Sequence, residues 1–548
     1  MKRGGGVLMH ISSLPGPFGI GVFGEEAVEF AKKLSAQGMK YWQVLPFSYP
    51  GMGNSPYQSF SAFAGNWLFI DPRRLAQRGL LTPTEVQNAE YNENKWRIDY
   101  DYLRSNRVEL LRKAFERADK ALLKEVDKFL EKNKWAGDVA AYLSIKDDNF
   151  GRPWWEWTDS RLKNYDKKAV EELKGNPNYM FHAFVQYLFI DEWTKIKKEI
   201  NDLGISIIGD MPFYVSGDSA DVWASRELFK MASPSKTNKL LADYEKEVAK
   251  YQTLKAKAEK SGDAEKKEDG KDEITEPRKP KPEALVFESV AGVPPDYFCE
   301  DGQLWGNPIY DWKKMKADNY SWWMDRIGEN FKLYDYLRID HFRAFSSYWE
   351  VDANAETARI GKWQKGPALE FFAEYDKVFG DRSRLIAEDL GEITPDLKEF
   401  MEKVGIPGMR VMEFTFYPGD DSSFMPHNFN KNCVAYTGTH DNNTLLGWLW
   451  DSREDVRDFC LKYCGFEGSN WGDGGPHSGS CRAIIRTLWM SHADVAIIPI
   501  QDMLGYGADT RMNIPGTPTG NWIVRFSKED LDSIDNEWYR TLNTLYYR

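Results

Sequence analysis

Tyr336-Leu337-Arg338-Ile339-Asp340 is a short strand-forming run that ends in an acid, and runs of this form recur along the 548 residues of the chain. Short apolar, β-branched runs that alternate with amphipathic stretches indicate βα units and a parallel sheet. We count eight runs, the number that a closed barrel requires. We therefore expect an α/β protein of the (β/α)₈ TIM barrel class, with strands at residues 6–10, 41–45, 206–210, 336–340, 384–388, 409–413, 434–439 and 495–501, and helices at 25–37, 181–201, 368–379, 395–404 and 482–492.

Two connections are too long for simple loops and must carry structure of their own. Residues 71–176, after the second strand, are charged and patterned as helices, which predicts a helical insertion. A second insertion spans 211–332, after the third strand, and its portion 234–282 is a charged, low-complexity insert rich in Lys and Glu. Within it, 236–260 has the pattern of a solvated helix and 261–282 that of a disordered segment or a tether. We expect one barrel over the whole chain and no separate C-terminal β-domain.

The composition narrows the class of ligand. A formal net charge of −12 argues against nucleic acid as a partner, because nucleic-acid binding requires basic surface. An acidic protein suits a neutral substrate. Aromatic residues make up 14% of the chain, which fits either stacking on sugar-like ligands or a large core with many Trp anchors.

The sequence also predicts a location. Residues 1–7 contain no apolar signal-peptide core, and nowhere do about eighteen apolar residues run together. Five cysteines are too sparse for a disulfide framework and fit a reducing compartment. We expect a cytoplasmic protein with no membrane partner, and both a bacterial cytosol and a plastid stroma stay open. Nothing demands a metal or another cofactor, and the oligomeric state is not predicted.

Acids stand where six of the predicted strands end. The active site of a barrel is built at the carboxyl ends of its strands. One acid there means little, since Asp often caps a following helix. Six acids that converge on one mouth would repel each other and raise some pKa values, a cost that chemistry can use and packing cannot. The six are Asp210, Asp340, Glu388, Glu413, Asp441 and Asp502.

Two of these acids fit the needs of glycoside cleavage with retention, which uses one carboxylate nucleophile and one protonated carboxylic acid roughly 5 Å apart. Arg338 lies two residues before Asp340, so it points to the same side of the strand and can hold that carboxylate ionised and oriented. Glu388 has no basic neighbour at the matching offset and is the better general acid/base. Asp441, beside His440, is expected to bind ring hydroxyls and to stabilise positive charge in the transition state.

An ordered set of motifs resembles one known family, the amylomaltases or disproportionating enzymes of the α-amylase clan. The resemblance covers most of the chain apart from the Lys/Glu-rich insert. It rests on Ser55-Pro56-Tyr57-Gln58-Ser59-Phe60, Gly209-Asp210-Met211-Pro212, Arg338-Ile339-Asp340-His341-Phe342-Arg343, Ala387-Glu388-Asp389-Leu390-Gly391 and Gly438-Thr439-His440-Asp441-Asn442, and on residues 61–66, 292–298, 302–308 and 511–517.

The resemblance implies a 4-α-glucanotransferase that carries α-1,4-glucan segments between maltooligosaccharides through a covalent ester. It assigns Asp340 as the nucleophile, Glu388 as the acid/base and Asp441 as the group that steadies the transition state. It also implies a cover loop at 290–312, whose Tyr297, Phe298 and Trp305 could stack on glucose faces and exclude water. The substrate-binding residues that it implies are Ser55, Tyr57, Asp210, Tyr297, Trp305, Asn307, Arg338, His341, His440 and Asn442.

Other interpretations compete with this one. An α-glucan hydrolase would share the catalytic trio, since the trio alone does not decide between water and sugar as acceptor. A non-catalytic glucan-binding barrel is a second alternative, because a fold does not guarantee activity. Residues 19–24 spell G-x-G-x-x-G before a helix, but Glu25 and Glu26 put negative charge where a dinucleotide would place its pyrophosphate. Structural roles remain an alternative for His341, Tyr57 and Trp305.

Overall fold

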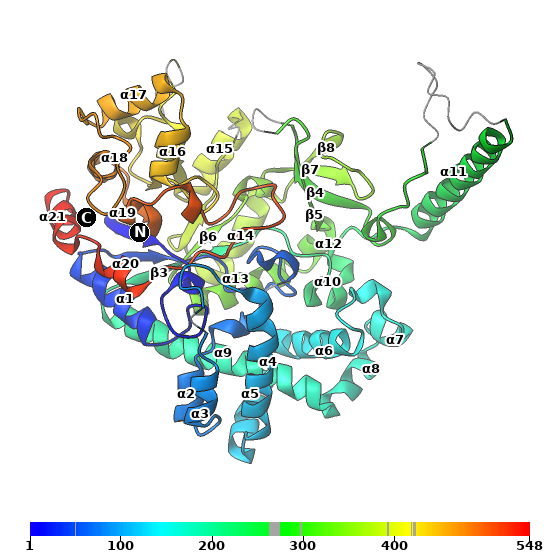
Figure 1. The fold of residues 1–548 in the computed structure, drawn as a ribbon. Coiled ribbons are helices and arrows are strands. Elements are labelled where there is room, and N and C mark those ends of the chain that lie inside the picture. Colours follow the sequence, from blue (N-terminus) through cyan, green and yellow to red (C-terminus); the bar gives the residue numbers. More distant parts are fainter. Residues whose placement is uncertain are drawn as a thin grey trace.

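The computed structural model describes residues 1–49, 51–91, 93–261, 275–295, 299–391, 394–417, 419 and 424–548. Eight parallel strands form one sheet in the order β10-β11-β12-β1-β2-β3-β6-β9 (Figure 1). The N–H of Ala387 donates to the carbonyl of Pro407, directly before β10, at 2.9 Å. This bond brings the two edge strands together and closes the barrel. The strands are β1 (Gly4–Leu8), β2 (Tyr41–Gln43), β3 (Ser206–Met211), β6 (Tyr336–Ile339), β9 (Leu385–Ala387), β10 (Gly408–Val411), β11 (Cys433–Tyr436) and β12 (Val495–Pro499).

The predicted barrel class is confirmed, and each predicted strand overlaps one of these eight. The five predicted helices are present as well, and their sequences explain their bounds. In α1 the side chains of Ala27, Phe30, Ala31 and Leu34 are buried, at the spacing of one helix face. The helices are α1 (Glu25–Ala36), α9 (Pro177–Asp202), α14 (Ala368–Phe379), α15 (Pro395–Val404) and α18 (Gly479–Met490).

Glycines let the first strand and the loop after it pack closely. A Cβ on Gly6 would lie 2.6 Å from Ile497 Cδ1, so only glycine lets β12 approach β1 at this point. In the G-x-G-x-x-G segment, a Cβ on Gly21 would lie 1.8 Å from the carbonyl oxygen of Ile11. The glycines of this segment therefore serve backbone packing, which removes the main support for a dinucleotide fold.

The chain between β2 and β3 is helical. Its helices precede α9, which packs against α1 of the barrel (Figure 1). Asp and Thr side chains cap most of them, as such residues do at helix starts. The helices are α2 (Pro72–Gln77), α3 (Pro83–Asn88), α4 (Tyr100–Glu116), α5 (Lys120–Lys132), α6 (Lys134–Asp148), α7 (Ser160–Lys163) and α8 (Lys167–Glu172).

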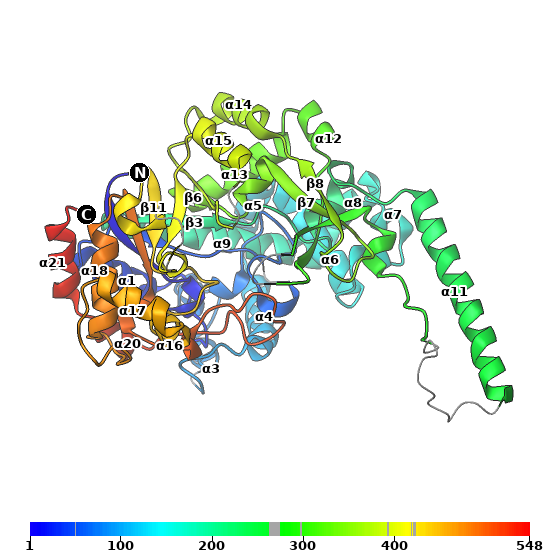
Figure 2. The ribbon, with the colours of Figure 1, turned by 90° about the horizontal axis from the view of Figure 1, so that it is seen from above.

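The connection from β3 to β6 contains a long helix, α11 (Pro234–Ser261), that extends away from the body of the molecule in both views (Figures 1 and 2). Over residues 234–256 its side chains are mostly exposed, as the charged sequence predicts. Most of the expected tether at 261–282 lies outside the described residues. The other helices of this connection are α10 (Ala220–Ala224), α12 (Trp312–Ala317) and α13 (Ser321–Leu333).

A second sheet, which the sequence analysis did not predict, lies beside the barrel (Figure 1). It is antiparallel, with the order β5-β4-β7-β8. Two of its strands occupy the stretch 290–312 that was interpreted as a loop, and the other two form an insertion after β6. The strands are β4 (Ser289–Val293), β5 (Gln303–Pro308), β7 (Ser347–Asp352) and β8 (Gly361–Lys365).

After β11 and β12 the described chain contains only helices, so no strand of a C-terminal β-domain occurs in that part. They are α16 (Leu445–Asp451), α17 (Glu454–Tyr463), α19 (Ile500–Leu504), α20 (Lys528–Asp532) and α21 (Asn536–Leu545). Among the helices that the structure describes, none has the length and apolar character that crossing a bilayer requires.

Candidate active site

The six acids all lie at or just beyond the carboxyl ends of barrel strands. Asp210 belongs to β3, Asp340 follows β6 directly, and Glu388 follows β9 directly. Glu413, Asp441 and Asp502 follow β10, β11 and β12. The short connections fix these positions, because each acid is at most five residues from the end of its strand. The acids therefore gather at one end of the barrel, as barrel topology requires.

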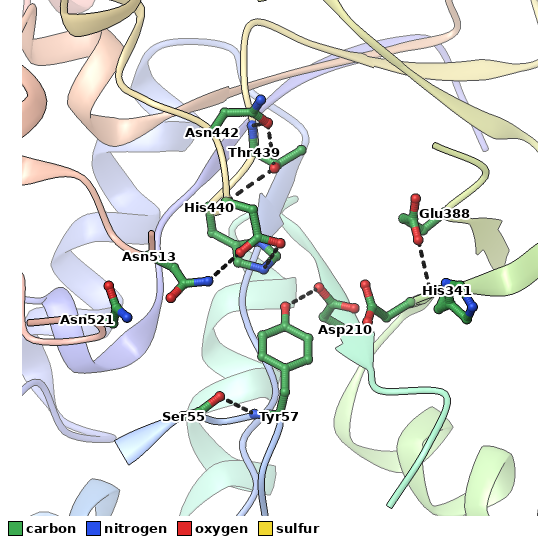
Figure 3. Close-up of polar contacts among 12 residues, drawn as sticks. Ser55, Tyr57, Asp210, His341, Glu388, Thr439, His440, Asn442, Asn513 and Asn521 are labelled. Atoms are coloured by element: carbon green, nitrogen blue, oxygen red, sulfur yellow. Dashed lines mark hydrogen bonds and ion pairs between the residues drawn. The ribbon is translucent and has the colours of Figure 1, made fainter. Parts of the chain in front are cut away.

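One guanidinium group connects several of these acids. Arg338 Nη1 donates to both carboxylate oxygens of Asp210, at 2.7 and 2.5 Å. Its Nη2 lies 3.0 Å from Asp340 Oδ1. The hydroxyl of Tyr57 donates to Asp210 Oδ2 at 2.9 Å, so the loop after β2 is attached to the same network (Figure 3). Arg338 and Asp210 are buried, and a charged pair of this kind has its charges balanced and its geometry fixed.

The backbone holds Glu388 in place. Its Oε2 accepts the N–H of His341 and its Oε1 accepts the N–H of Leu390, each at 2.8 Å (Figure 3). His341 adopts the left-handed conformation, with φ of 48°. This conformation is uncommon for residues other than glycine and often marks a functional turn. Here the turn directly after Asp340 aims a backbone donor at Glu388.

Burial and mutual repulsion give the carboxyls of Asp340 and Glu388 different pKa values. Burial raises the pKa of Asp340 to about 6; Asp210 and Asp441 also raise this pKa, whereas Arg338 opposes the rise. Burial raises the pKa of Glu388 to about 7, and repulsion from Asp340 adds to the rise. We predicted that Arg338 keeps Asp340 ionised. The guanidinium does lower the pKa of Asp340, but desolvation of the buried carboxyl outweighs this effect.

Asp441 is positioned by a distant segment of the chain. Asn513 Nδ2 donates to Asp441 Oδ1 at 2.6 Å, and Arg511 donates to the Asp441 carbonyl. His440 Nε2 lies 3.4 Å from Asp441 Oδ2. The ring of His440 stacks on Tyr57, with centroids 5.3 Å apart and planes 12° from parallel. Figure 3 shows His440 and Asn513, the two contacts of the Asp441 carboxylate, on one side of Tyr57, and Glu388 and His341 on the other side.

Three residues of this arrangement were not predicted as site residues. Arg511 and Asn513 lie in a motif that carried the resemblance, but no role was assigned to them. Trp522 is buried, and its ring centroid lies 5.7 Å from that of Tyr57 and 5.9 Å from that of His440. Its φ of 66° is unusual for a large side chain. No local pattern marks it, since its contacts are with loops after β2 and β11.

Of the remaining predicted residues that the structure describes, one packs against His341, and the others stabilise loops or backbone. Trp305 packs edge-on against His341, with centroids 4.7 Å apart. Ser55 accepts the N–H of Tyr57 at 3.3 Å, and Asn442 Oδ1 accepts from the N–H and hydroxyl of Thr439, so both stabilise loops that carry other site residues. Asn307 is buried and donates to the carbonyl of Val215 at 2.8 Å, a contact that supports the backbone. Tyr297 and Phe298 lie outside the described residues.

In the part of the chain that the structure describes, no group of three or more His, Cys, Asp or Glu side chains is arranged to hold a metal ion.

Comparisons with known proteins agree with this geometry. Residues 9–530 match the glycoside hydrolase 77 family, described as 4-alpha-glucanotransferase. A 4-alpha-glucanotransferase of Streptococcus pneumoniae serotype 4 is 38% identical over 100% of this chain and 98% of its own length. A chloroplastic/amyloplastic 4-alpha-glucanotransferase of Solanum tuberosum is 35% identical over 98% of this chain and 84% of its own length.

Solved structures lead to the same family. The structure of the amylomaltase from Streptococcus agalactiae in complex with acarbose superimposes with a TM-score of 0.86 over 100% of both chains, at 36% identity. The amylomaltase from Corynebacterium glutamicum, at 15% identity and a TM-score of 0.70 over 99% of this chain and 75% of its own, shares the fold. The chain therefore belongs to the glycoside hydrolase 77 family of 4-alpha-glucanotransferases.

Proposed function

We propose that this protein is a 4-α-glucanotransferase that moves α-1,4-glucan segments between maltooligosaccharides, or to glucose, by a retaining double displacement. The observation that carries the proposal is the pair Asp340 and Glu388 at the barrel mouth. Both carboxyl pKa values are raised, and that of Glu388 lies above that of Asp340. One carboxylate that attacks and one acid that still holds a proton is the combination that retention requires.

In the first step, Asp340 attacks the anomeric carbon and forms an ester as the glycosidic C–O bond breaks. Glu388 gives its proton to the departing oxygen, so the leaving chain ends in a hydroxyl group. In the second step Glu388 takes the proton from the hydroxyl of an acceptor sugar, whose oxygen displaces Asp340 and forms a new α-1,4 bond. Asp441, held by Asn513, faces the positive charge that develops on the ring.

Other residues have supporting roles in this proposal. Arg338 orients Asp340, and Tyr57 and His440 form an aromatic wall beside Asp441. Trp305, against His341, would cover the ester and disfavour water as the acceptor. Four residues contribute to sugar binding indirectly, because they hold loops and charged groups of the site in place. They are Ser55, Asp210, Asn307 and Asn442.

Incubation with maltotriose alone tests the function. We expect glucose together with products both longer and shorter than maltotriose, while the number of reducing ends stays constant, because each transfer breaks one α-1,4 bond and makes another. Chromatography of the products and a reducing-end assay measure both quantities. A steady rise in reducing ends would favour the hydrolase, and binding without any product would favour a non-catalytic glucan-binding protein.

The pH dependence of kcat/KM is expected to be bell-shaped. Activity requires Asp340 ionised, so it falls as pH drops through the pKa of about 6. Activity also requires Glu388 protonated, so it falls as pH rises through the pKa of about 7. Because the two carboxyls interact, the two limbs report the pair. Initial rates with maltotriose between about pH 4.5 and about pH 9 measure the profile. A rate that stays constant below pH 6 or above pH 7 would contradict this assignment.

We further propose that the protein works in the cytoplasm, or in a plastid stroma if it comes from a plant, on glucans derived from starch or glycogen and on maltose-series sugars. The name of the Solanum tuberosum relative includes chloroplastic/amyloplastic, which supports the plastid for a plant protein. Five cysteines in 548 residues are too sparse for a disulfide framework, which supports a reducing compartment such as the cytoplasm. A formal net charge of −12 supports a neutral glucan, rather than nucleic acid, as the partner.

A further inference from the structure

An exposed tryptophan stands on the second sheet close to the barrel mouth. Trp363, on the edge strand β8, is 45% exposed. Tryptophan rarely leaves so much of its surface in water, because burying the ring is strongly favourable. The residue is also not needed to close the barrel, since β8 pairs only with β7. Exposure alone does not identify a ligand contact, since Trp96 is 54% exposed and singly exposed apolar residues are common. The surroundings of the Trp363 ring distinguish it.

The position of the ring is fixed by two neighbours. Trp349, directly opposite in β7, packs against it with centroids 5.4 Å apart and planes at 66°. The guanidinium carbon of Arg343 lies over the ring, 4.5 Å from its centroid. Gly361, the next residue of β8 on the same face, has no side chain; a Cβ there would lie 2.5 Å from Trp349 Cε2. The ring is thus a rigid platform with a cation on it.

The platform connects to the catalytic groups through one short segment. Arg343 belongs to the turn (Phe342–Phe345) that follows Asp340 and His341. The His341 N–H holds Glu388 at 2.8 Å, and its ring contacts Trp305. Arg343 lies close enough to His341 that its charge, after burial, contributes to lowering the pKa of the imidazole to about 3. The exposed ring therefore lies one side chain away from the residues around Glu388.

We propose that Trp363, held by Arg343 and Trp349, is an outer subsite that stacks on a glucosyl unit of an α-1,4-glucan chain, beyond the sugars at the bond that is cut. The apolar C–H face of a glucose ring matches the flat indole. The inference rests on the proposed function and adds a determinant of chain-length preference: long chains reach the platform, and short ones do not.

Steady-state kinetics of Trp363→Ala with two donors test the proposal. An aromatic contact contributes about 0.5–1.5 kcal/mol, which corresponds to a roughly two- to twelvefold change in KM. We expect an increase of that size for maltoheptaose, less than about twofold for maltotriose, and little change in kcat. Trp363→Phe, which keeps a flat ring, should restore most of the affinity. Trp96→Ala is the matched control, since Trp96 is 54% exposed and also lies under a cation, Lys95.

Two outcomes would contradict the proposal that Trp363 is an outer subsite. One is an equal loss for both donors, which would indicate a structural role, and the other is no change for either. If Trp363→Ala does not fold, Trp363→Leu retains an apolar contact with Trp349, removes the flat face and must show the same dependence on chain length. A parent protein without transfer activity would contradict the proposed function, whereas an active parent with length-independent variants would contradict the platform alone.

Discussion

Replacing Asp340 by alanine is expected to lower kcat/KM for maltotriose disproportionation by about 10⁴-fold or more, because no group then remains to form the ester. Arg338 keeps its two bonds to Asp210 in the variant, so the charge network around the site survives. The loss should appear in kcat, since the missing interaction is made only as the bond breaks. Product chromatography with long incubation measures it.

A small anion should restore turnover of an activated donor by this variant. Azide can enter the space left by the carboxylate and attack the anomeric carbon of α-maltosyl fluoride, which releases fluoride and yields the β-azide. Rescue with inverted configuration would identify Asp340 as the nucleophile, because only a group on that face is being replaced. Asp335→Asn is the matched control: Asp335 stands at the amino end of the same strand, where it accepts the Ile207 N–H, and its loss should leave activity close to that of the parent. Near-full activity of Asp340→Ala would overturn the assignment.

The Asp340→Ala variant should also fold. The pKa of Asp340 is about 6 in the folded protein against an ordinary 3.8. The folded protein therefore binds more protons than the unfolded chain between these values, so the free energy of unfolding falls as pH rises through this window and stays lowered above it. Alanine removes this unfavourable group at neutral pH, although it also removes the contact with Arg338. We expect an unfolding temperature at or above that of the parent at pH 7.5.

The barrel could be predicted because each strand is defined by nearby residues. Leu385–Ala387 is an apolar run bounded by charged residues, and Tyr336–Ile339 is apolar except for Arg338. The helices between strands have one buried face. The boundaries were less accurate. The run 495–501 was predicted as one strand, yet β12 ends at Pro499 and α19 begins at Ile500. Proline ends the strand there because it has no N–H to donate to the ladder.

The second sheet could not be predicted in the same way. The burial of β7 and β8 shows no clean alternation, and β8 is mostly exposed. Their pairing is determined by contacts between distant residues, such as Gly292 with Trp349 and Trp349 with Trp363. Strand preference depends strongly on such partners. A sequence that resembles a loop in isolation therefore becomes a sheet when the barrel supplies its neighbours.

The acids of the site could be predicted, whereas the groups that orient them could not. Strand ends place Asp340, Glu388 and Asp441 at one mouth, whatever the loops do. The partners of Asp441 come from residues 511–513, about 70 positions away, in a connection with no periodic pattern. The N–H groups that donate to Glu388 belong to the backbone, so no residue type in the sequence predicts them. The Arg338 guanidinium was expected to serve Asp340, which it contacts with Nη2, but its second bond, from Nη1 to Asp210, was not expected.

Replacing Glu388 by glutamine should lower kcat/KM for maltotriose by about 10²- to 10⁴-fold, the range that general acid/base catalysis contributes. Glutamine keeps the size of the side chain but has only one acceptor oxygen, so one of the two amide donors, His341 or Leu390, loses its partner. This mismatch is expected to cost about 1–3 kcal/mol of folding stability, which thermal unfolding measures separately. Glu413→Gln is the matched comparison, since Glu413 is a buried carboxylic acid at a neighbouring strand end whose pKa is raised well above its usual value, so the amide resembles its neutral form. We expect it to change activity by less than about tenfold.

An activated donor separates the two steps that Glu388 serves. Fluoride leaves α-maltosyl fluoride without needing a proton, so Glu388→Gln should still form the ester on Asp340. Its breakdown requires a base to take the proton of the acceptor, and that base is missing. The ester should therefore accumulate, and mass spectrometry should find a maltosyl unit on the peptide that contains Asp340. The basic limb of the pH profile should disappear in the same variant, because that limb belongs to the proton of Glu388. A label on another residue, or turnover of maltotriose equal to that of the parent, would show that the acid and the nucleophile have been assigned to the wrong carboxyls.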